Sequence, residues 1–209
     1  MEEDGVFTPV EGVTDTCHII DASVRLIPWA AKMTAEKLIR TMPKFSDELG
    51  EFSESLPWLD FVRIVNEAKS AHKEKLEDAG DVGGAAHLWL QDSIQYAIDN
   101  TDGIVLELDY REPTDERAKN CGLAAFNWMK KHSVQWIATE MVVFSRKYRY
   151  AGTTDGLAFV DSCDELKCCP VKFHHELSVI DWKSSNYLKT EYLYQTASYL
   201  NCILEQFGE

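Results

Sequence analysis

Two stretches of the 209-residue sequence combine acidic side chains with a lysine in a pattern that can bind a divalent cation and activate water. Asp155 lies in GTTDG, a G-x-x-D-G pattern, and Asp181 and Lys183 lie in VIDWKSS. If VIDWKSS is extended, the side-chain period of two puts Asp181 and Lys183 on one face and Ile180 and Trp182 on the other. An isolated D-x-K triplet is most often a surface ion pair, so its interpretation depends on the rest of the chain.

A third acid, Glu140, falls in the apolar stretch WIATEMVVFS. Neighbouring strands lie about 4.8 Å apart, so Glu140, Asp155 and Asp181 can meet if they share one face of adjacent strands. Such carboxylates repel one another unless a cation lies between them, and hard oxygen ligands favour Mg²⁺ or Mn²⁺. Lys183 would then orient or help deprotonate a water molecule and stabilise negative charge in the transition state.

Two helical segments offer further polar groups to the same place. His87 shares a helical stripe with Gln91, Ile94 and Ile98, so it points toward whatever that stripe packs against. A lone histidine on an apolar face is more often a satisfied core residue than a ligand. Gln195 and Tyr199 stand at i and i+4 of a later helix, and the alternative for this pair is the boundary of an amphipathic face.

Hydrophobic periodicity predicts the elements that must position these groups. We expect helices over residues 23–42, 57–76, 84–100, 114–132 and 188–206, with Gly80, Gly83 and Gly84 before the third. Residues 136–145 and 148–160 read as a β-hairpin, and a third strand contains VIDWKSS. This order predicts an α+β or mixed α/β fold with a small twisted mixed sheet flanked by helices. We expect residues 1–209 to form a single domain, with 1–80 as an N-terminal helical cap region and 81–209 as the core.

The composition of the chain limits the kinds of partner that it can bind. The net charge of -14 argues against nonspecific attraction to polyanions, although Lys130–Lys131–His132 and Arg146–Arg149 form local basic patches. No run is long and apolar enough for a membrane span, and the acidic start MEEDGVFTPVEG does not resemble a signal peptide. We therefore expect an intracellular, cytoplasmic protein with no membrane partner.

The cysteines raise the question of a second metal. Without an export signal we expect all six to be reduced thiols: Cys17, Cys121, Cys163, Cys168, Cys169 and Cys202. The C-x4-CC cluster of Cys163, Cys168 and Cys169, followed by His174 and His175, could bind zinc. It contains no C-x2-C pair, and adjacent cysteines are poorly spaced for joint chelation. We interpret this segment as a polar excursion between two strands.

Taken together, five stretches resemble the PD-(D/E)xK nuclease superfamily, and within it the RecB-like exonucleases, including phage-type members. They are LIPWAAKMTAEKL, GGAAHLWLQ, TEMVVFSRKYRYAGTTDGLAFVD, VIDWKSS and QTASY, which occur in the order typical of that family. The resemblance implies a restriction-endonuclease-like core. Family members usually continue with strands after the Q-x-x-x-Y helix, so we expect a core that lacks them in a sequence ending at Glu209.

The resemblance also implies roles for individual residues. His87, Asp155, Asp181 and the backbone carbonyl of Trp182 would be metal ligands; Lys183, Asp155 and Asp181 would be catalytic; Gln195, Tyr199 and Glu140 would support the substrate or the site. The implied activity is a Mg²⁺- or Mn²⁺-dependent DNA exonuclease acting on linear single- or double-stranded DNA. Replication or recombination proteins would be its partners, in a bacterial or phage-infected host.

Two other functions remain open on the same residues. One is a noncatalytic nucleic-acid- or protein-binding module that keeps the nuclease fold. The other is a structure- or site-specific endonuclease with the same chemistry. Some relatives hold an iron–sulfur cluster through late cysteines, but here these precede the third strand instead of following the Q-x-x-x-Y helix, so we expect no such cluster.

Overall fold

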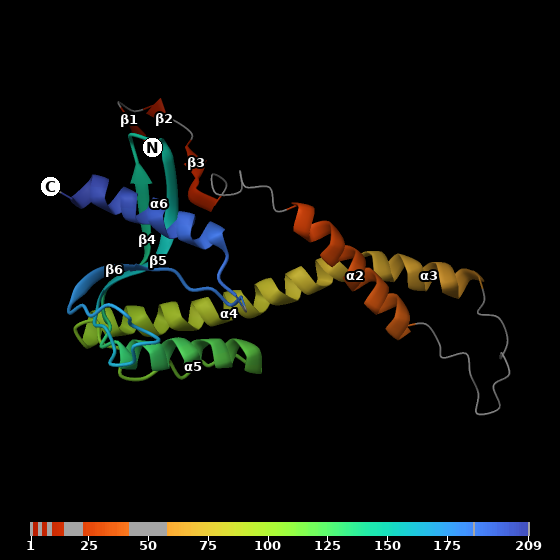
Figure 1. Ribbon diagram of the computed structural model, residues 1–209, viewed down its shortest axis with the longest axis horizontal. Coiled ribbons are helices and arrows are strands. Elements are labelled where there is room, and N and C mark those ends of the chain that lie inside the picture. The colour runs from red at the N-terminus through yellow and green to blue at the C-terminus, as the bar shows by residue number, and fades with distance from the viewer. Residues whose placement is uncertain are drawn as a thin grey trace. The chain divides into compact units, whose positions relative to one another are not determined.

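The computed structural model describes residues 2–3, 6–7, 10–14, 23–41, 58–185 and 187–208. Within them the fold is α+β, with five helices and a small mixed sheet of four strands, as the sequence predicts (Figure 1). The helices are α2 (Ser23–Thr41), α3 (Trp58–Lys69), α4 (Ala71–Asn100), α5 (Glu116–Lys131) and α6 (Thr190–Phe207). The strands are β1 (Glu2–Glu3), β2 (Val6–Phe7), β3 (Glu11–Gly12), β4 (Gln135–Ser145), β5 (Tyr150–Val160) and β6 (Glu176–Ile180).

The chain divides into two compact units. One comprises residues 1–20 and 82–209, and the other comprises residues 21–81. The second unit contains α2, α3 and the start of α4, with Met33, Ile64 and Ala68 buried and an ion pair between Lys37 and Glu74. The division predicted at residue 80 stays a prediction. In the described part of the chain, no helix is long and apolar enough to cross a membrane.

Strand β5 is the centre of the four-stranded sheet. It pairs antiparallel with β4, and also pairs with β3 (parallel, at Tyr150) and with β6 (antiparallel, from Gly156 onward). Every second residue of β5 from Thr154 to Val160 is buried, which is the alternation expected of a strand with two different faces. The predicted hairpin of β4 and β5 is confirmed.

Two apolar clusters hold the elements of this unit together. The larger one joins α4, α5 and the sheet through residues such as Ile94, Met129 and Trp136. The smaller one packs α6 on the sheet through Tyr199 and Val143, and α6 lies across β4 and β5 in Figure 1. The two clusters thus pack α4 with α5 and α6 against separate parts of the sheet.

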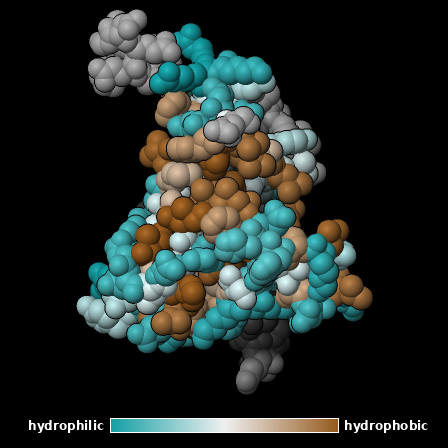
Figure 2. All heavy atoms as spheres, turned by 90° about the vertical axis from the view of Figure 1, so that its left-hand side faces the viewer, coloured by the Kyte–Doolittle hydropathy of each residue, from teal (hydrophilic) through white to brown (hydrophobic). Residues whose placement is uncertain are grey.

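The outer faces of the same elements carry exposed apolar side chains. Val142 is exposed beside buried Val143 on β4, and Leu204 is exposed beside buried Ile203 on α6. Figure 2 shows hydrophobic side chains gathered over the middle of the face that it presents. Burial of alternate faces therefore leaves part of the apolar content of this unit in contact with solvent.

Several predicted boundaries are wrong. The helix expected over 57–76 breaks at Ser70, whose hydroxyl donates to the Glu67 carbonyl, and α4 then runs through Gly80, Gly83 and Gly84 instead of beginning after them. Residues 42 and 57 lie outside the described residues, as does Cys17. A Cβ at Gly83 would come within 3.0 Å of Ser184 Oγ, so glycine there lets the segment after β6 approach α4.

Candidate functional site

Asp155 on β5 is the most constrained of the predicted site residues. Its side chain is 15% exposed. One carboxylate oxygen, Oδ2, accepts a hydrogen bond from the Trp182 backbone N–H at 2.5 Å, and the other lies 3.7 Å from His87 Nδ1 on α4. Burial raises the pKa of Asp155, while His87 and the Trp182 amide act in the opposite direction. The carboxylate is therefore held by groups from α4 and from the segment after β6.

Asp181 and Lys183 follow β6 instead of lying inside it, because the strand ends at Ile180. Their charged groups meet at 2.5 Å; the Asp181 side chain is 5% exposed and that of Lys183 is 23% exposed. The Lys183 ammonium also lies 5.3 Å from the centre of the Tyr192 ring. This pair is consequently a largely buried ion pair and not the surface pair expected of an isolated triplet.

The strand register brings this pair to Asp155. Gly156 is the partner of Ile180 across the β5–β6 ladder, and Thr154 Oγ1 donates to the Ile180 carbonyl at 3.3 Å. Asp155 lies between these two residues of β5, and Asp181 follows Ile180. Asp181, just after the end of β6, therefore stands level with Asp155 on β5.

Glu140 lies at the edge of this group. On β4 it falls between Thr139 and Met141, whose partners are the residues on either side of Asp155. Its φ of 49° is in the left-handed region, which is uncommon for a residue with a side chain and is a form of strain found at functional sites. Burial raises the pKa of Glu140, and the charge of Asp155 raises it further.

Gln195 and Tyr199 are joined to each other on α6. Gln195 Nε2 donates to the Tyr199 hydroxyl at 2.9 Å, and burial raises the pKa of that hydroxyl, with Asp181 and Asp155 adding to the effect. The Tyr199 ring belongs to the smaller apolar cluster, and a Cβ on Gly152 would lie 2.8 Å from it. Tyr199 therefore has a packing role that accounts for its position, beside any role at the site.

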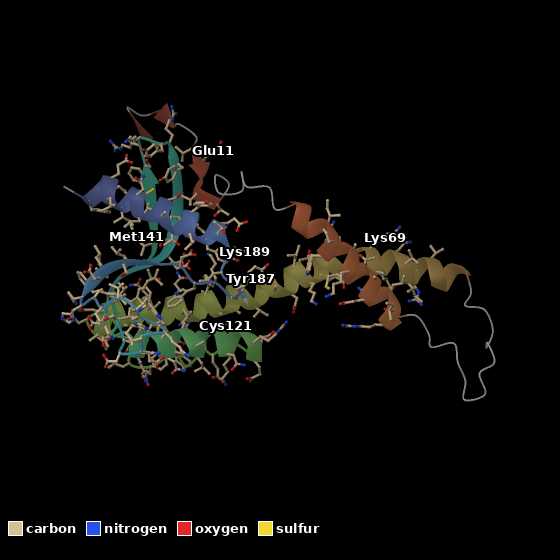
Figure 3. The ribbon with its side chains drawn as sticks, viewed as in Figure 1. Glu11, Lys69, Cys121, Met141, Tyr187 and Lys189 are labelled. Carbon is tan, nitrogen blue, oxygen red and sulfur yellow. The ribbon has the colours of Figure 1, made fainter. Side chains whose placement is uncertain are left out.

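A pocket of about 350 Å³ opens beside three of the predicted residues, His87, Trp182 and Lys183. Its wall also includes Cys121 on α5, which Figure 3 labels, and Ser184. The predicted acids Glu140, Asp155 and Asp181 do not line it. The space next to the lysine is thus bounded by α4, α5 and the segment after β6.

The predicted metal ligands do not form a group of three. Among the described residues, the ligand atoms that come together within 4.8 Å of one another are those of His132, Cys163, Cys168 and Cys169, and this group can hold a metal ion. Asp155 and Asp181 each have one oxygen, Oδ2, in contact with a protein donor. The Trp182 contact that the structure shows is made by its N–H, and the role predicted for its carbonyl stays a prediction.

The cysteine segment is therefore more than the polar excursion that the sequence suggested, because its thiols come together. The choice of His174 and His175 as the histidines that accompany these thiols is wrong. His174 is 87% exposed and its ring bonds Asp161. The histidine that meets the cysteines is His132, the C-cap of α5, which the sequence showed only as part of a basic patch. No periodic signal links a helix cap to cysteines in a later segment.

Comparisons with known proteins add no assignment. No protein-family model matches the sequence, and neither a curated protein nor a solved structure matches the chain. The functional assignment therefore depends on the site itself.

Proposed function

We propose that this protein is a Mg²⁺- or Mn²⁺-dependent deoxyribonuclease, acting from the ends of DNA, on a restriction-endonuclease-like core. The observation that carries the proposal is the meeting of Asp155, in the middle of β5, with Asp181 and Lys183, which follow the end of the paired strand β6, while His87 reaches Asp155 from α4. A chain that only needed a stable sheet would gain nothing from burying two acids side by side.

The chemical types of the donors suit a hard divalent cation, which would have to draw together ligand atoms that do not form a group of three in the described structure. Asp155 and Asp181 offer carboxylate oxygens and His87 an imidazole nitrogen, and burial already disfavours the charged form of Asp155. When bound, such a cation supplies charge neutralisation at the phosphoryl oxygens and lowers the pKa of water. These three side chains would hold it, with Glu140 at the edge.

The chain's own groups would perform the remaining steps. Lys183 would release Asp181 and place its ammonium beside the scissile phosphate, where it stabilises developing negative charge and orients the attacking water. Gln195 and Tyr199 would fix the wall formed by α6. The Tyr192 ring, 5.3 Å from the Lys183 ammonium, would help to orient the lysine.

The segment before α6 supports binding of a nucleic-acid strand. Tyr187 is exposed, and the Lys189 ammonium lies 5.9 Å from its ring centre; both are labelled in Figure 3. Aromatic faces stack on bases and lysines contact phosphates, which is the chemistry that single strands require. This arrangement places a positive charge locally in a chain whose net charge is -14.

A second function is favoured by one specific observation. Each buried acid already has a partner in the protein, because Lys183 neutralises Asp181 and the Trp182 N–H bonds Asp155. This arrangement also suits a noncatalytic module that keeps the nuclease fold and binds nucleic acid or protein. Cleavage assays and titration with Mn²⁺ separate the two functions.

The test is cleavage of end-labelled linear duplex, linear single-stranded and circular DNA in Mg²⁺ or Mn²⁺, with chelator as the blank. We expect the linear substrates to be shortened from their ends and Lys183→Ala to lose at least about 100-fold in rate. Lys119→Ala is the matched control, since Lys119 is also ion-paired and its side chain is 28% exposed, but it stands on α5 beside Glu112. Its rate should equal that of the wild type.

Three results would change the conclusion. Equal rates for Lys183→Ala and the wild type would remove the lysine from the mechanism. Cleavage of circular DNA at the same rate as linear DNA would make the enzyme an endonuclease. Absence of any cleavage, together with no heat of binding when Mn²⁺ is titrated, would favour the noncatalytic module.

A further inference from the structure

The segment between β5 and β6, residues 161–175, brings three thiols to a helix end. Cys163 and Cys169 are buried and Cys168 is exposed, and His132 is almost fully buried at the C-terminus of α5. One ring nitrogen of His132 and the three sulfur atoms lie within 4.8 Å of one another. Nothing in the proposed nuclease chemistry uses these four residues.

The spacing of the atoms fits a tetrahedral ion. Zinc lies about 2.3 Å from thiolate sulfur and about 2.0 Å from imidazole nitrogen, which makes the edges of a tetrahedral site about 3.8 Å between sulfurs and about 3.5 Å between sulfur and nitrogen. Cys163 Sγ and Cys169 Sγ are 3.6 Å apart, and Cys168 Sγ lies 3.5 Å from His132 Nε2. These two edges have the lengths of a filled site, and the remaining ligand atoms lie within 4.8 Å of one another.

The hydrogen bonds around the cluster are those of a metal-ligating histidine. His132 Nδ1 lies 2.9 Å from the Asp161 carbonyl oxygen, to which it can donate, and this leaves Nε2 as the ring nitrogen with a free lone pair. The backbone N–H groups of Cys168 and Cys169 both donate to the Glu165 carbonyl, at 3.0 and 2.8 Å, so a tight turn presents the adjacent cysteines. The turn therefore lets the adjacent residues Cys168 and Cys169 direct both sulfur atoms toward the same point.

A disulfide and simple packing of thiols both fit the geometry less well than a metal ion does. A disulfide needs its sulfurs about 2.05 Å apart, which is well short of the 3.6 Å between Cys163 and Cys169. Packing accounts for burial of a cysteine, but it gives no reason for a buried imidazole to face three of them. Three sulfurs and one nitrogen also select a soft or borderline cation and reject Mg²⁺.

We propose that His132, Cys163, Cys168 and Cys169 bind one structural Zn²⁺ ion. All four positions of the tetrahedron are filled by protein, so the site is closed to substrate. The ion would fasten residues 161–175 to the end of α5 and so fix the chain where it enters β6, the strand that leads to Asp181. The proposal does not depend on the proposed nuclease activity.

The experiment is metal analysis of the full chain purified without added metal, followed by X-ray absorption at the zinc edge. We expect one zinc per chain that survives dialysis against EDTA, with three sulfur neighbours at about 2.3 Å and one nitrogen at about 2.0 Å. Replacement by Co²⁺ should give the visible absorption of a tetrahedral thiolate complex. These readouts require no activity and no variant.

Variants then assign the ligands. Cys168→Ser should lose most of the zinc, and because Cys168 is exposed this change leaves the core intact. Two control variants should keep one zinc per chain. Cys121→Ser removes a thiol of α5 outside the cluster, and His174→Ala removes a histidine that lies outside the cluster. Asp155→Asn should also keep the zinc, which separates this site from the proposed nuclease centre.

Three outcomes overturn the proposal. A wild-type chain with less than about a tenth of an equivalent of zinc and no tetrahedral Co²⁺ spectrum would leave only a thiol cluster. Mass spectrometry that finds the chain lighter by two hydrogens, and a digest in which Cys163 and Cys169 stay linked, would show a disulfide instead of a metal site. Loss of zinc in His174→Ala but not in Cys168→Ser would put the ion elsewhere.

Discussion

The ion pair of Asp181 and Lys183 offers a stability test that is independent of any assay for DNA cleavage. Removal of one partner of a buried pair costs about 3–5 kcal/mol, because the other charge stays buried without compensation. The Asp181 side chain is 5% exposed, whereas the Lys183 side chain is 23% exposed, so we expect a cost at the lower end of this range. We expect Lys183→Met to lower the free energy of unfolding by about 3 kcal/mol and Tm by about 6–12 °C.

The measurement is urea denaturation at pH 7 with chelator, completed as a double-mutant cycle with Asp181→Leu. The double variant should regain most of the loss, because two apolar side chains replace the pair without leaving a buried charge. Lys119→Met is the control: its partner Glu112 is more than half exposed, so the change should cost less than about 1 kcal/mol.

Divalent cations sharpen the test. In Lys183→Met, Asp181 is left without its ammonium partner, so Mg²⁺ can occupy the acids without displacing a lysine. We expect Mg²⁺ to raise Tm more in this variant than in the wild type. A coupling energy below about 0.5 kcal/mol, or equal losses for Lys183→Met and Lys119→Met, would refute the reasoning about burial of the pair.

Three further predictions follow from other parts of the unit. Gly152→Ala should lower stability by about 1–3 kcal/mol in urea denaturation, because its Cβ would lie 2.8 Å from the Tyr199 ring. A hydrogen bond from Ser145 and two from backbone amides hold the pKa of Glu205 below its ordinary 4.5, so its contribution is present above pH 4.5 and is lost as pH falls through the lowered pKa; Glu205→Gln should flatten the acid side of a Tm–pH profile. Burial raises the pKa of Asp155, so its contribution is present below 3.8 and lost as pH rises; Asp155→Asn should match or exceed the wild-type Tm at pH 7 in chelator while losing the rise caused by Mg²⁺.

Each of these predictions has a matched control. Gly84→Ala, on the exposed face of α4 with open space around its Cβ, should stabilise the chain by about 1 kcal/mol. Glu107→Gln and Asp99→Asn change exposed acids and should leave the pH profile and the response to Mg²⁺ as they are in the wild type. Equal behaviour of a test variant and its control would contradict the corresponding prediction.

Local patterns predicted most elements of the core unit. Richness in β-branched and aromatic residues predicted the β4–β5 hairpin, and the stripe that contains His87 and Ile94 predicted which face of α4 is buried. The start of α4 was mispredicted because glycine is a helix breaker only on average: Gly80 and Gly84 meet nothing within 4 Å, and Gly83 makes room for Ser184. Packing decided that boundary.

By itself the sequence identified the candidate groups for the site. A G-x-x-D-G pattern singled out Asp155, and the period of two in an extended VIDWKSS put Asp181 and Lys183 on one face, since that period depends only on backbone geometry over a few residues. The sequence also identified the three clustered cysteines as candidate ligands.

Only the tertiary structure decided what these groups contact. Asp155 takes the Trp182 N–H as a partner because β6 ends one residue before Asp181, and that end is set by pairing with β5. His132 meets the cysteines because α5 ends where the segment after β5 returns. Contacts between residues far apart in the chain depend on where elements stop and turn, and no local periodicity encodes that position.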